Sequence, residues 1–356
     1  MSNNSNTNKR NPYTILFGRP PLTFLPRETQ RQMILQEFTD DLINNQAYVI
    51  VGLRGSGKTV FMSDIANRIA KLPDWEVVDL NPERNLLEDM VSTLSSRRKL
   101  SELFRASKIN LSYFGFGVDI SGADPIANTE EAARLMLKSL KKHKKRVLIT
   151  VDEVTNSKSI REFALAFQSF IREELPIFFL STGLYENIKE LEGSKGNTFF
   201  MRTPKITMEP LSLRSIAENY EKTFSLEQED AVNMALLTKG YSFAFQVLGY
   251  YTWEAEGDYK KSISKYKNHL FGYSYDKIWS ELSHEDKTFA YGIAKSEDGS
   301  VASIREITGW AANKIGPYRN RLNKKGLLNL ERYGYISFNL PLFDLFVLEK
   351  REDMLL

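Results

Sequence analysis

The feature that most constrains this chain is a glycine-rich turn between an apolar strand and an amphipathic helix. The turn reads Gly52-Leu53-Arg54-Gly55-Ser56-Gly57-Lys58-Thr59. Residues 47–51 before it are a short apolar run, and residues 60–71 after it place apolar side chains at helical spacing. Buried apolar strands that alternate with helices are typical of a parallel sheet covered on both faces. The segment therefore predicts an α/β fold with a parallel sheet.

The residue types of this turn suit a nucleotide phosphate. Glycines let the backbone curl so that N–H groups point at a phosphate, and the helix N-terminus adds a favourable dipole. Lys58 is expected to place its charge between the β- and γ-phosphates, and the Thr59 hydroxyl to ligate Mg²⁺. The alternative, a glycine turn that binds nothing, fits the flanking strand and helix poorly. The predicted phosphate-binding residues are Gly52, Arg54, Gly55, Ser56, Gly57, Lys58, Thr59 and Val60.

A second apolar strand, residues 147–151, ends in two carboxylates, Asp152 and Glu153. Ligands of open α/β sheets bind at the carboxyl ends of the strands. Asp152 is therefore predicted to join Thr59 in the Mg²⁺ site, and Glu153 to orient the attacking water. A carboxylate in the Glu153 position favours nucleotide hydrolysis, whereas phosphoryl transfer to a small acceptor does not require it.

A third apolar strand, residues 176–180, ends in two hydroxyl residues, Ser181 and Thr182. Ser181 is the candidate contact to the γ-phosphate and Thr182 is the alternative. A hydroxyl that only caps the following helix fits the pattern equally well.

The length of 356 residues exceeds that of one ordinary domain. We expect a disordered tail over 1–16, a P-loop core over 17–210, a small helical lid over 211–275 and a winged helix-turn-helix over 276–356. The core should include a helix over 25–44, a β-hairpin over 108–120 and a helix over 129–142 capped by Thr129. In the last domain Pro317 should begin the third helix, and a hairpin should follow.

The basic residues concentrate near the C-terminus. The whole chain carries a net charge of only +3, whereas residues 314–332 hold six basic residues and one acid. Such a stripe is typical of nucleic-acid binding, although winged helices also serve as protein–protein modules and a helix dipole favours cations at its C-terminus. The predicted DNA contacts are Lys314, Arg319, Arg321, Lys324, Lys325 and Arg332.

Composition excludes several kinds of site. The chain has no cysteine, which removes disulfides, thiolate metal sites and cysteine nucleophiles, and its three histidines lie far apart. No apolar run approaches the 18 residues of a membrane span, and the N-terminus lacks the apolar segment of a secretory signal. We therefore expect a cytoplasmic protein without a membrane segment.

Several motifs occur together in one order: FGRPPLTFLPRE, GLRGSGKT, VLITVDE, FFMRTPKITMEPLS, KGYSFAFQVLG and PYRNRLNKKGLLNLERYGYISFNLPLF. With them the chain resembles the AAA+ ATPases of the origin-recognition and archaeal-ATPase type, over about residues 17–348. The resemblance implies a switch driven by ATP, ADP and Mg²⁺ that binds double-stranded DNA or assembles with copies of itself or a protein partner. Arg202 matches an arginine that reaches the nucleotide of a neighbouring subunit, although an ordinary exposed arginine fits equally well.

Two departures from the family pattern favour slow ATP turnover. The lid segment 241–249 has no arginine where origin-binding members carry one, and the third strand ends in Ser-Thr instead of the commoner asparagine. Both suit a second interpretation, a signalling ATPase of the STAND type whose winged helix makes protein or intramolecular contacts. A P-loop kinase is disfavoured by Glu153, the lid and the C-terminal domain.

Overall fold

The computed structural model describes residues 10–16, 21–40, 45–107, 109, 128–194 and 198–353, with side chains to residue 351. Contacts divide the chain into two units, which are described separately. The sheet unit comprises Pro26–Gly52 and Lys58–Met208, and the lid unit comprises Met1–Leu25, Leu53–Gly57 and Glu209–Leu356. Leu53–Gly57 of the glycine-rich turn therefore group with the lid, whereas Gly52, Lys58 and Thr59 group with the sheet.

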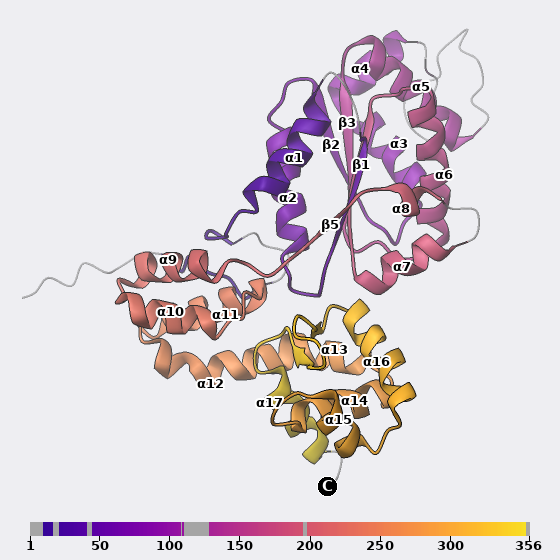
Figure 1. Ribbon diagram of the computed structural model, residues 1–356. Coiled ribbons are helices and arrows are strands. Elements are labelled where there is room, and N and C mark those ends of the chain that lie inside the picture. The colour runs from indigo at the N-terminus through magenta and orange to yellow at the C-terminus, as the bar shows by residue number, and fades with distance from the viewer. Residues whose placement is uncertain are drawn as a thin grey trace, which may run out of the picture. The chain divides into compact units, whose positions relative to one another are not determined.

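The sheet unit is built on five parallel strands in the order β2-β3-β4-β1-β5 (Figure 1). The strands are β1 (Ala47–Val51), β2 (Trp75–Leu80), β3 (Arg146–Val151), β4 (Ile177–Gly183) and β5 (Lys205–Thr207). β1 and β4 are buried along their whole length, as expected for strands covered on both faces. β4, which carries Ser181 and Thr182, lies between β1 and β3. It therefore separates the strand before the glycine-rich turn from the strand before Asp152. The predicted parallel α/β core is confirmed.

Helices cover both faces of this sheet. They are α1 (Glu28–Thr39), α2 (Lys58–Ile69), α3 (Leu86–Ser96), α4 (Arg98–Ala106), α5 (Thr129–Lys142), α6 (Lys158–Arg172), α7 (Tyr185–Gly193) and α8 (Phe199–Arg202). α1 and α2 pack on the face that carries Phe178. The helices α3 to α8 pack on the face that carries Phe179. Successive strand residues point to opposite faces, so these two neighbours enter different layers of the core.

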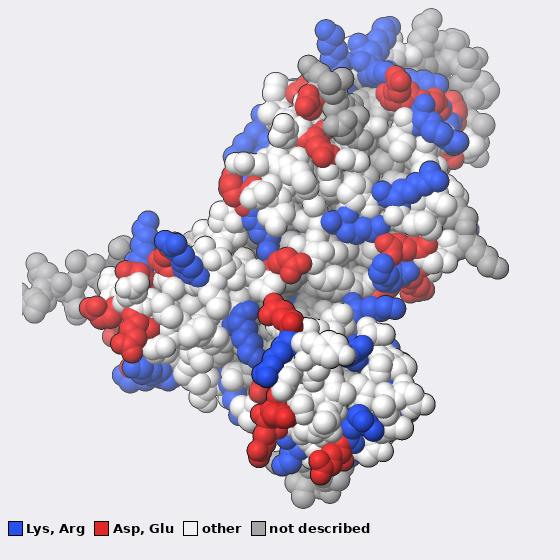
Figure 2. Space-filling model, in the orientation of Figure 1, with Lys and Arg blue, Asp and Glu red and all other residues white. Residues whose placement is uncertain are grey.

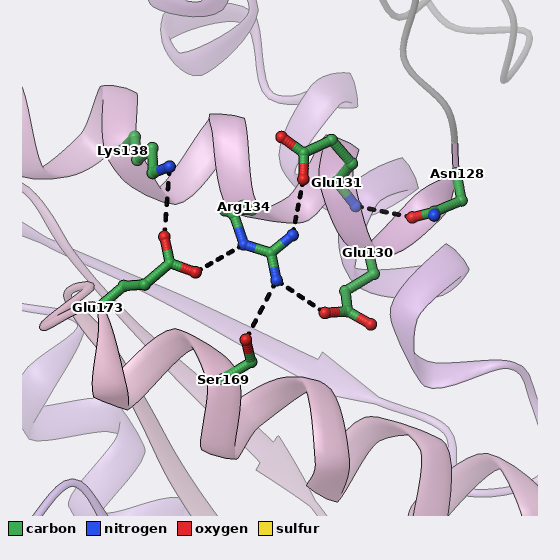
Figure 3. Close-up of polar contacts among 7 residues, drawn as sticks. All are labelled: Asn128, Glu130, Glu131, Arg134, Lys138, Ser169 and Glu173. Atoms are coloured by element: carbon green, nitrogen blue, oxygen red, sulfur yellow. Dashed lines mark hydrogen bonds and ion pairs between the residues drawn. The ribbon is translucent and has the colours of Figure 1, made fainter.

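One arginine ties α5 to α6 (Figure 3). The Arg134 guanidinium donates to Glu131 at 2.6 Å, Glu130 at 2.8 Å, Glu173 at 2.7 Å and Ser169 at 3.1 Å. The hydrogen bond from Arg134 holds the pKa of the Glu173 carboxyl below its usual range. These bonds join residues of α5 to Ser169 and Glu173 at the end of α6, so we assign the cluster to the packing of α5 on α6.

Some predicted boundaries in the sheet unit were wrong. The N-cap of α5 is Asn128, whose side chain accepts the Glu131 N–H at 2.9 Å, and not Thr129. The helix predicted over 25–44 begins at Glu28 and ends at Thr39, where Asp40 adopts an extended backbone; residues 41–44 lie outside the described residues. Apart from Ile109, the predicted hairpin over 108–120 also lies outside them.

The lid unit joins two helical groups through one long helix. Its helices are α9 (Leu213–Phe224), α10 (Gln228–Leu236), α11 (Ser242–Glu254), α12 (Tyr259–Leu270), α13 (Asp276–Ser280), α14 (His284–Lys295), α15 (Val301–Thr308), α16 (Ala312–Lys324) and α17 (Phe343–Asp353). A π-helical turn, Phe271–Tyr275, connects α12 to α13 without a break. Two short antiparallel strands, β6 (Leu328–Asn329) and β7 (Ser337–Phe338), follow α16. One apolar core runs through both groups, from Phe245 of α11 to Phe346 of α17.

Two expectations for the lid unit need correction. Of the predicted tail over 1–16 the structure describes residues 10–16, and Tyr13 among them is 2% exposed within the lid. A side chain at Gly249 would place its Cβ 2.5 Å from the Tyr13 ring, so the glycine makes room for this segment. Pro317 lies inside α16 instead of beginning it. Gly316 before it lacks the side chain with which a proline ring clashes, so the helix can continue.

None of the helices in the described ranges is long and apolar enough to cross a membrane.

Candidate nucleotide site

Two threonines and two carboxylate residues meet where β3 and β4 end. The Thr59 hydroxyl donates to Asp152 Oδ2 at 2.8 Å, and the Thr182 hydroxyl donates to Asp152 Oδ1 at 2.5 Å. Thr182 also accepts the Glu153 backbone N–H at 2.9 Å. The start of α2, the end of β3 and the end of β4 are thus joined at the carboxyl edge of the sheet. The structure brings together the residues predicted for the metal and water positions.

The hydroxyl residue of β4 that faces this cluster is Thr182 and not the candidate, Ser181. Ser181 is 0% exposed, and its Oγ has no hydrogen-bond partner among the described residues. It lies on the opposite face of the strand because consecutive strand residues alternate. The sequence predicted that both residues lie at the end of this strand. It could not show which of the two faces the site, because that depends on which layer of helices covers each face of the sheet.

Glu153 combines exposure with an unusual backbone. Its side chain is exposed and its φ is +54°, in the left-handed region that non-glycine residues seldom adopt. The hydrogen bonds from Glu153 N–H to Thr182 Oγ1 and from Val154 N–H to Thr182 O, at 2.8 Å, hold this geometry. An exposed carboxylate next to Asp152 is suited to contact water, the position predicted for Glu153.

The start of the glycine-rich turn and the beginning of α2 form the other side of the predicted site. Lys58 is buried, and its ammonium donates to the Gly52 carbonyl at 3.1 Å. Val60 lies half-buried in the first turn of α2. These residues belong to the sheet unit, whereas Leu53–Gly57 group with the lid.

Within Leu53–Gly57 two glycines have a backbone conformation that other residues seldom adopt. Gly55 and Gly57 have φ of +73° and +90°, which only glycine adopts without strain. The Ser56 N–H closes the turn on the Leu53 carbonyl at 3.2 Å. Ser56 Oγ is buried and has no hydrogen-bond partner among the described residues, so it is available to a ligand.

The lid contacts this turn through three hydrogen bonds, which we call the lid clamp. Three consecutive residues at the start of α11 donate to three consecutive carbonyl oxygens of the turn. The bonds are Tyr241 Oη to Arg54 O at 2.7 Å, Phe243 N to Gly55 O at 3.0 Å and Ser242 Oγ to Ser56 O at 2.9 Å. Burial raises the pKa of Tyr241 far above its usual range, so the hydroxyl stays protonated and can donate. No local sequence pattern relates residues 241–243 to residues 54–56, so these contacts could not be predicted.

The six basic residues of the predicted DNA surface differ in their surroundings. Arg321 donates to Asp286 at 2.7 Å, and the Asp286 side chain is 3% exposed. Lys314 lies over the Trp310 ring at 4.2 Å and Arg332 over the Tyr335 ring at 3.6 Å. The others are exposed or half-buried near the end of α16, namely Arg319, Lys324 and Lys325. On the face drawn in Figure 2, basic and acidic side chains are interspersed.

Arg202 is exposed at the end of α8, two residues before β5 begins. Within the described part of the chain its side chain has no ion pair, and its role in a neighbouring subunit stays a prediction.

The oxygen donors of the site fit Mg²⁺. Thr59 and Asp152 bring a hydroxyl and a carboxylate together, and Mg²⁺ in phosphate sites is held by one or two such ligands with the phosphates and water. The glycine φ values and the buried Ser56 hydroxyl fit a phosphate chain in the same way.

Comparisons with known proteins agree with this fold. Residues 29–174 match the profile of a family described as an ATPase domain predominantly from Archaea, and residues 273–347 match a domain of unknown function. No curated protein matches the sequence. A Walker-type ATPase of Pyrococcus abyssi has a similar structure, with a TM-score of 0.62 at 14% identity over 90% of this chain and 97% of that one. The Aeropyrum pernix ORC2 protein in its ADPNP-ADP complexes gives a TM-score of 0.61 at 12% identity, over 94% and 97%. At these identities the similarity is one of fold.

Proposed function

We propose that this chain binds and slowly hydrolyses ATP as a nucleotide-dependent switch. The match of residues 29–174 to an ATPase domain predominantly from Archaea supports the proposal, as does the fold shared with a Walker-type ATPase and with the ORC2 protein. The observation that carries the proposal is the joining of Thr59, Asp152 and Thr182 at the end of the sheet. The turn would bind the phosphates, and Lys58 would neutralise their charge. Mg²⁺, when bound by Thr59 and Asp152, would offset the charge on the phosphate oxygens. Glu153 would orient water.

The test compares Lys58→Ala and Glu153→Gln with the native chain in nucleotide binding and phosphate release. Glu153→Gln keeps the side-chain shape, so nucleotide affinity should change little while hydrolysis falls by about 100-fold or more, the usual contribution of a general base. Lys58→Ala should weaken ATP binding itself. Lys71→Ala is the matched control, because Lys71 is exposed just beyond α2. Equal hydrolysis by native chain and Glu153→Gln would refute the role of Glu153.

We also propose that the helices α14–α16 and the strands β6 and β7 form a winged helix that binds double-stranded DNA. Three helices followed by a two-stranded antiparallel sheet support this proposal, as does the exposure of Arg319 and Lys324. DNA affinity should fall steeply with salt, because each neutralised phosphate releases counterions and contributes about −0.9 to the slope of log K against log salt.

Duplex binding is measured by fluorescence anisotropy at about 50 and 200 mM salt. The double variant Arg319→Ala/Lys324→Ala should bind more weakly and with a shallower slope. Lys222→Ala/Lys265→Ala removes the same charge from exposed positions on the lid helices and should bind as the native chain does. Equal affinity of both double variants would contradict DNA binding by α16.

A second candidate, a regulatory ATPase whose C-terminal region makes protein or intramolecular contacts, is favoured by one set of observations. Arg321, Lys314 and Arg332 already have partners within the lid unit. If this function holds, duplex binding should be weak and independent of salt in every nucleotide state.

For Arg202 we propose contact with the nucleotide of a neighbouring copy. Its exposure beside β5 supports this, since such a contact needs a side chain that no element of its own chain covers. Arg202→Ala should leave ATP binding unchanged and reduce hydrolysis only at protein concentrations where light scattering detects assembly. A cytoplasmic setting, with ATP and Mg²⁺ at hand, suits this function.

A further inference from the structure

The Tyr241 hydroxyl has two partners, which lie in different parts of the lid unit. It donates to the Arg54 carbonyl in the glycine-rich turn at 2.7 Å and lies 3.0 Å from Ser274 Oγ. Tyr241 is 5% exposed and Ser274 is 3% exposed, so water does not compete freely for either bond. Ser274 belongs to the π-helical turn Phe271–Tyr275. One buried side chain thus joins the predicted phosphate site to the segment between the lid and the C-terminal helices.

The same π-helical turn packs on the last helix of the chain. The Tyr275 hydroxyl donates to the Pro341 carbonyl at 2.6 Å, just before α17. The Tyr275 ring lies 5.1 Å from the ring of Phe343, and the Phe271 ring lies 5.1 Å from that of Phe346. Neighbouring positions of one turn therefore contact Tyr241 on one side and α17 on the other.

The lid clamp acts on the peptide groups that a phosphate would use. A hydrogen bond to the carbonyl of one residue polarises the N–H of the next, because both belong to the same peptide unit. The clamp bonds residues 54–56 on their carbonyls, which are the partners of the N–H groups of residues 55–57. The Ser56 N–H closes the turn on the Leu53 carbonyl, which leaves the Gly55 and Gly57 N–H groups as the candidates for a phosphate. A phosphate held by these two groups should strengthen the clamp, and the clamp should strengthen phosphate binding.

The π-helical turn Phe271–Tyr275 has a geometry that suits a hinge. π-helical turns insert one residue into an α-helix, and they occur often at functional sites. Here the turn interrupts an otherwise continuous helix from Tyr259 to Ser280. A side chain at Gly272 would meet no heavy atom within 4 Å, so the turn has open space on one side.

We propose that Tyr241 couples the state of the glycine-rich turn to the position of α17, through Ser274 and the π-helical turn. In this chain the lid senses the phosphate site by hydrogen bonds to backbone carbonyls, whereas an arginine is absent from residues 241–249. Rearrangement of the turn when nucleotide binds or is hydrolysed shifts the Tyr241 hydroxyl, and Ser274 moves with it. The inference rests on the proposed binding of nucleotide at the turn and adds its route to the C-terminal helices.

The experiment measures hydrogen exchange in peptides that cover residues 271–280 and 340–351, with ATP, with ADP and without nucleotide. It compares the native chain with Tyr241→Phe and Ser274→Ala. The control is Tyr266→Phe, which removes another buried hydroxyl of the lid unit that donates to a main-chain carbonyl, that of Leu237 at 2.7 Å. Nucleotide affinity of each variant is measured in parallel, and thermal unfolding shows whether each is folded.

In the native chain nucleotide should slow exchange in both peptides. Tyr241→Phe should abolish this difference and weaken nucleotide binding by about 2- to 12-fold, the factor that corresponds to the net 0.5–1.5 kcal/mol of one hydrogen bond. Ser274→Ala should abolish the exchange response and leave nucleotide affinity nearly unchanged. Tyr266→Phe should lose about as much thermal stability as Tyr241→Phe and should keep the slower exchange with nucleotide.

The outcomes distinguish failure of the coupling through Tyr241 from failure of the proposed nucleotide binding. If the native chain binds no nucleotide, the proposed function itself fails. If it binds nucleotide but the peptides do not respond, or if Tyr241→Phe responds as the native chain does, the coupling is refuted while nucleotide binding stands. Loss of the response in Tyr266→Phe as well would show that general loosening of the lid, and not the Tyr241 hydroxyl, is responsible.

Discussion

Thr182 holds Asp152 and Glu153 at the same time. Its hydroxyl donates to the Asp152 carboxylate and accepts the Glu153 backbone N–H at 2.9 Å. One side chain on β4 therefore sets the orientation of the predicted metal ligand and of the residue predicted to orient water. It does this from the strand that lies between β1 and β3.

Substitution of Thr182 should impair hydrolysis more than nucleotide binding. Thr182→Val keeps the side-chain shape and removes both hydrogen bonds, and loss of such a supporting partner usually costs about 10- to 100-fold in activity. We expect kcat to fall within that range with a small change in KM, measured by steady-state phosphate release. Ser181→Ala should leave kcat nearly unchanged because Ser181 faces the opposite layer. A larger loss in Ser181→Ala would show that β4 presents its other face to the nucleotide.

The sequence predicted the features of this site that depend on residues close together in the chain. The strands before the turn and before Asp152 lie in one parallel sheet, as predicted, because an apolar run that ends in glycines or in carboxylates is a local signal. The lid clamp joins residues about 190 positions apart and leaves no local signal, so Tyr241 was missed. The sequence left Ser181 and Thr182 as alternatives because strand alternation shows which residues share a face, but not which face meets the site.

The C-terminal elements show the same limit. α14 begins with a capping box, in which Ser283 and Asp286 bond one another's backbone N–H groups, and such a box depends on residues three positions apart. Net charge along residues 314–332 predicted a basic surface, but charge counting could not show that Arg321 is held by Asp286. A long-range ion pair of this kind depends on helix packing, which no window of sequence contains.

Gly55 should tolerate no side chain while Tyr241 keeps its hydroxyl. The Gly55 φ of +73° disfavours alanine by about 1–2 kcal/mol, and a Cβ would lie 2.3 Å from Tyr241 Oη. Gly55→Ala should therefore lower the free energy of unfolding and weaken nucleotide binding. Adding Tyr241→Phe removes the nearest atom, so the double variant should lose less than the sum of the two single losses. Strict additivity in urea denaturation would contradict a direct contact, and Gly193→Ala, with no atom within 4 Å, is the control.

Arg321 should matter more for stability than its predicted DNA role suggests. Arg321→Ala leaves the Asp286 carboxylate, 3% exposed, without its guanidinium partner. A buried acceptor that loses its partner costs about 1–3 kcal/mol, and we expect a loss in that range by urea denaturation. Arg319→Ala, an exposed position on the same helix, should change stability by less than about 0.5 kcal/mol. Equal losses would show that the ion pair contributes little.

Stability should depend on pH through His269. The ring is 7% exposed, lies 3.1 Å from the Tyr251 hydroxyl and stacks on Tyr273 at 4.3 Å. Burial lowers the pKa of His269 below its ordinary value of 6.5, so the folded state binds a proton less readily than the unfolded state. The contribution of neutral His269 is therefore complete above that value and is lost as pH falls below it.

His269→Phe keeps a ring for Tyr273 to stack on and removes the titration. Between pH 8 and pH 5.5 the native chain should lose more free energy of unfolding than this variant, with an extra slope of at most about 1.4 kcal/mol per pH unit for one proton. Carboxylates contribute equally to both proteins, so the difference isolates the histidine. Urea midpoints at pH 8 give the reference, because His269 is neutral there in both states. Parallel curves over the whole range would show that protonation of His269 is not linked to folding.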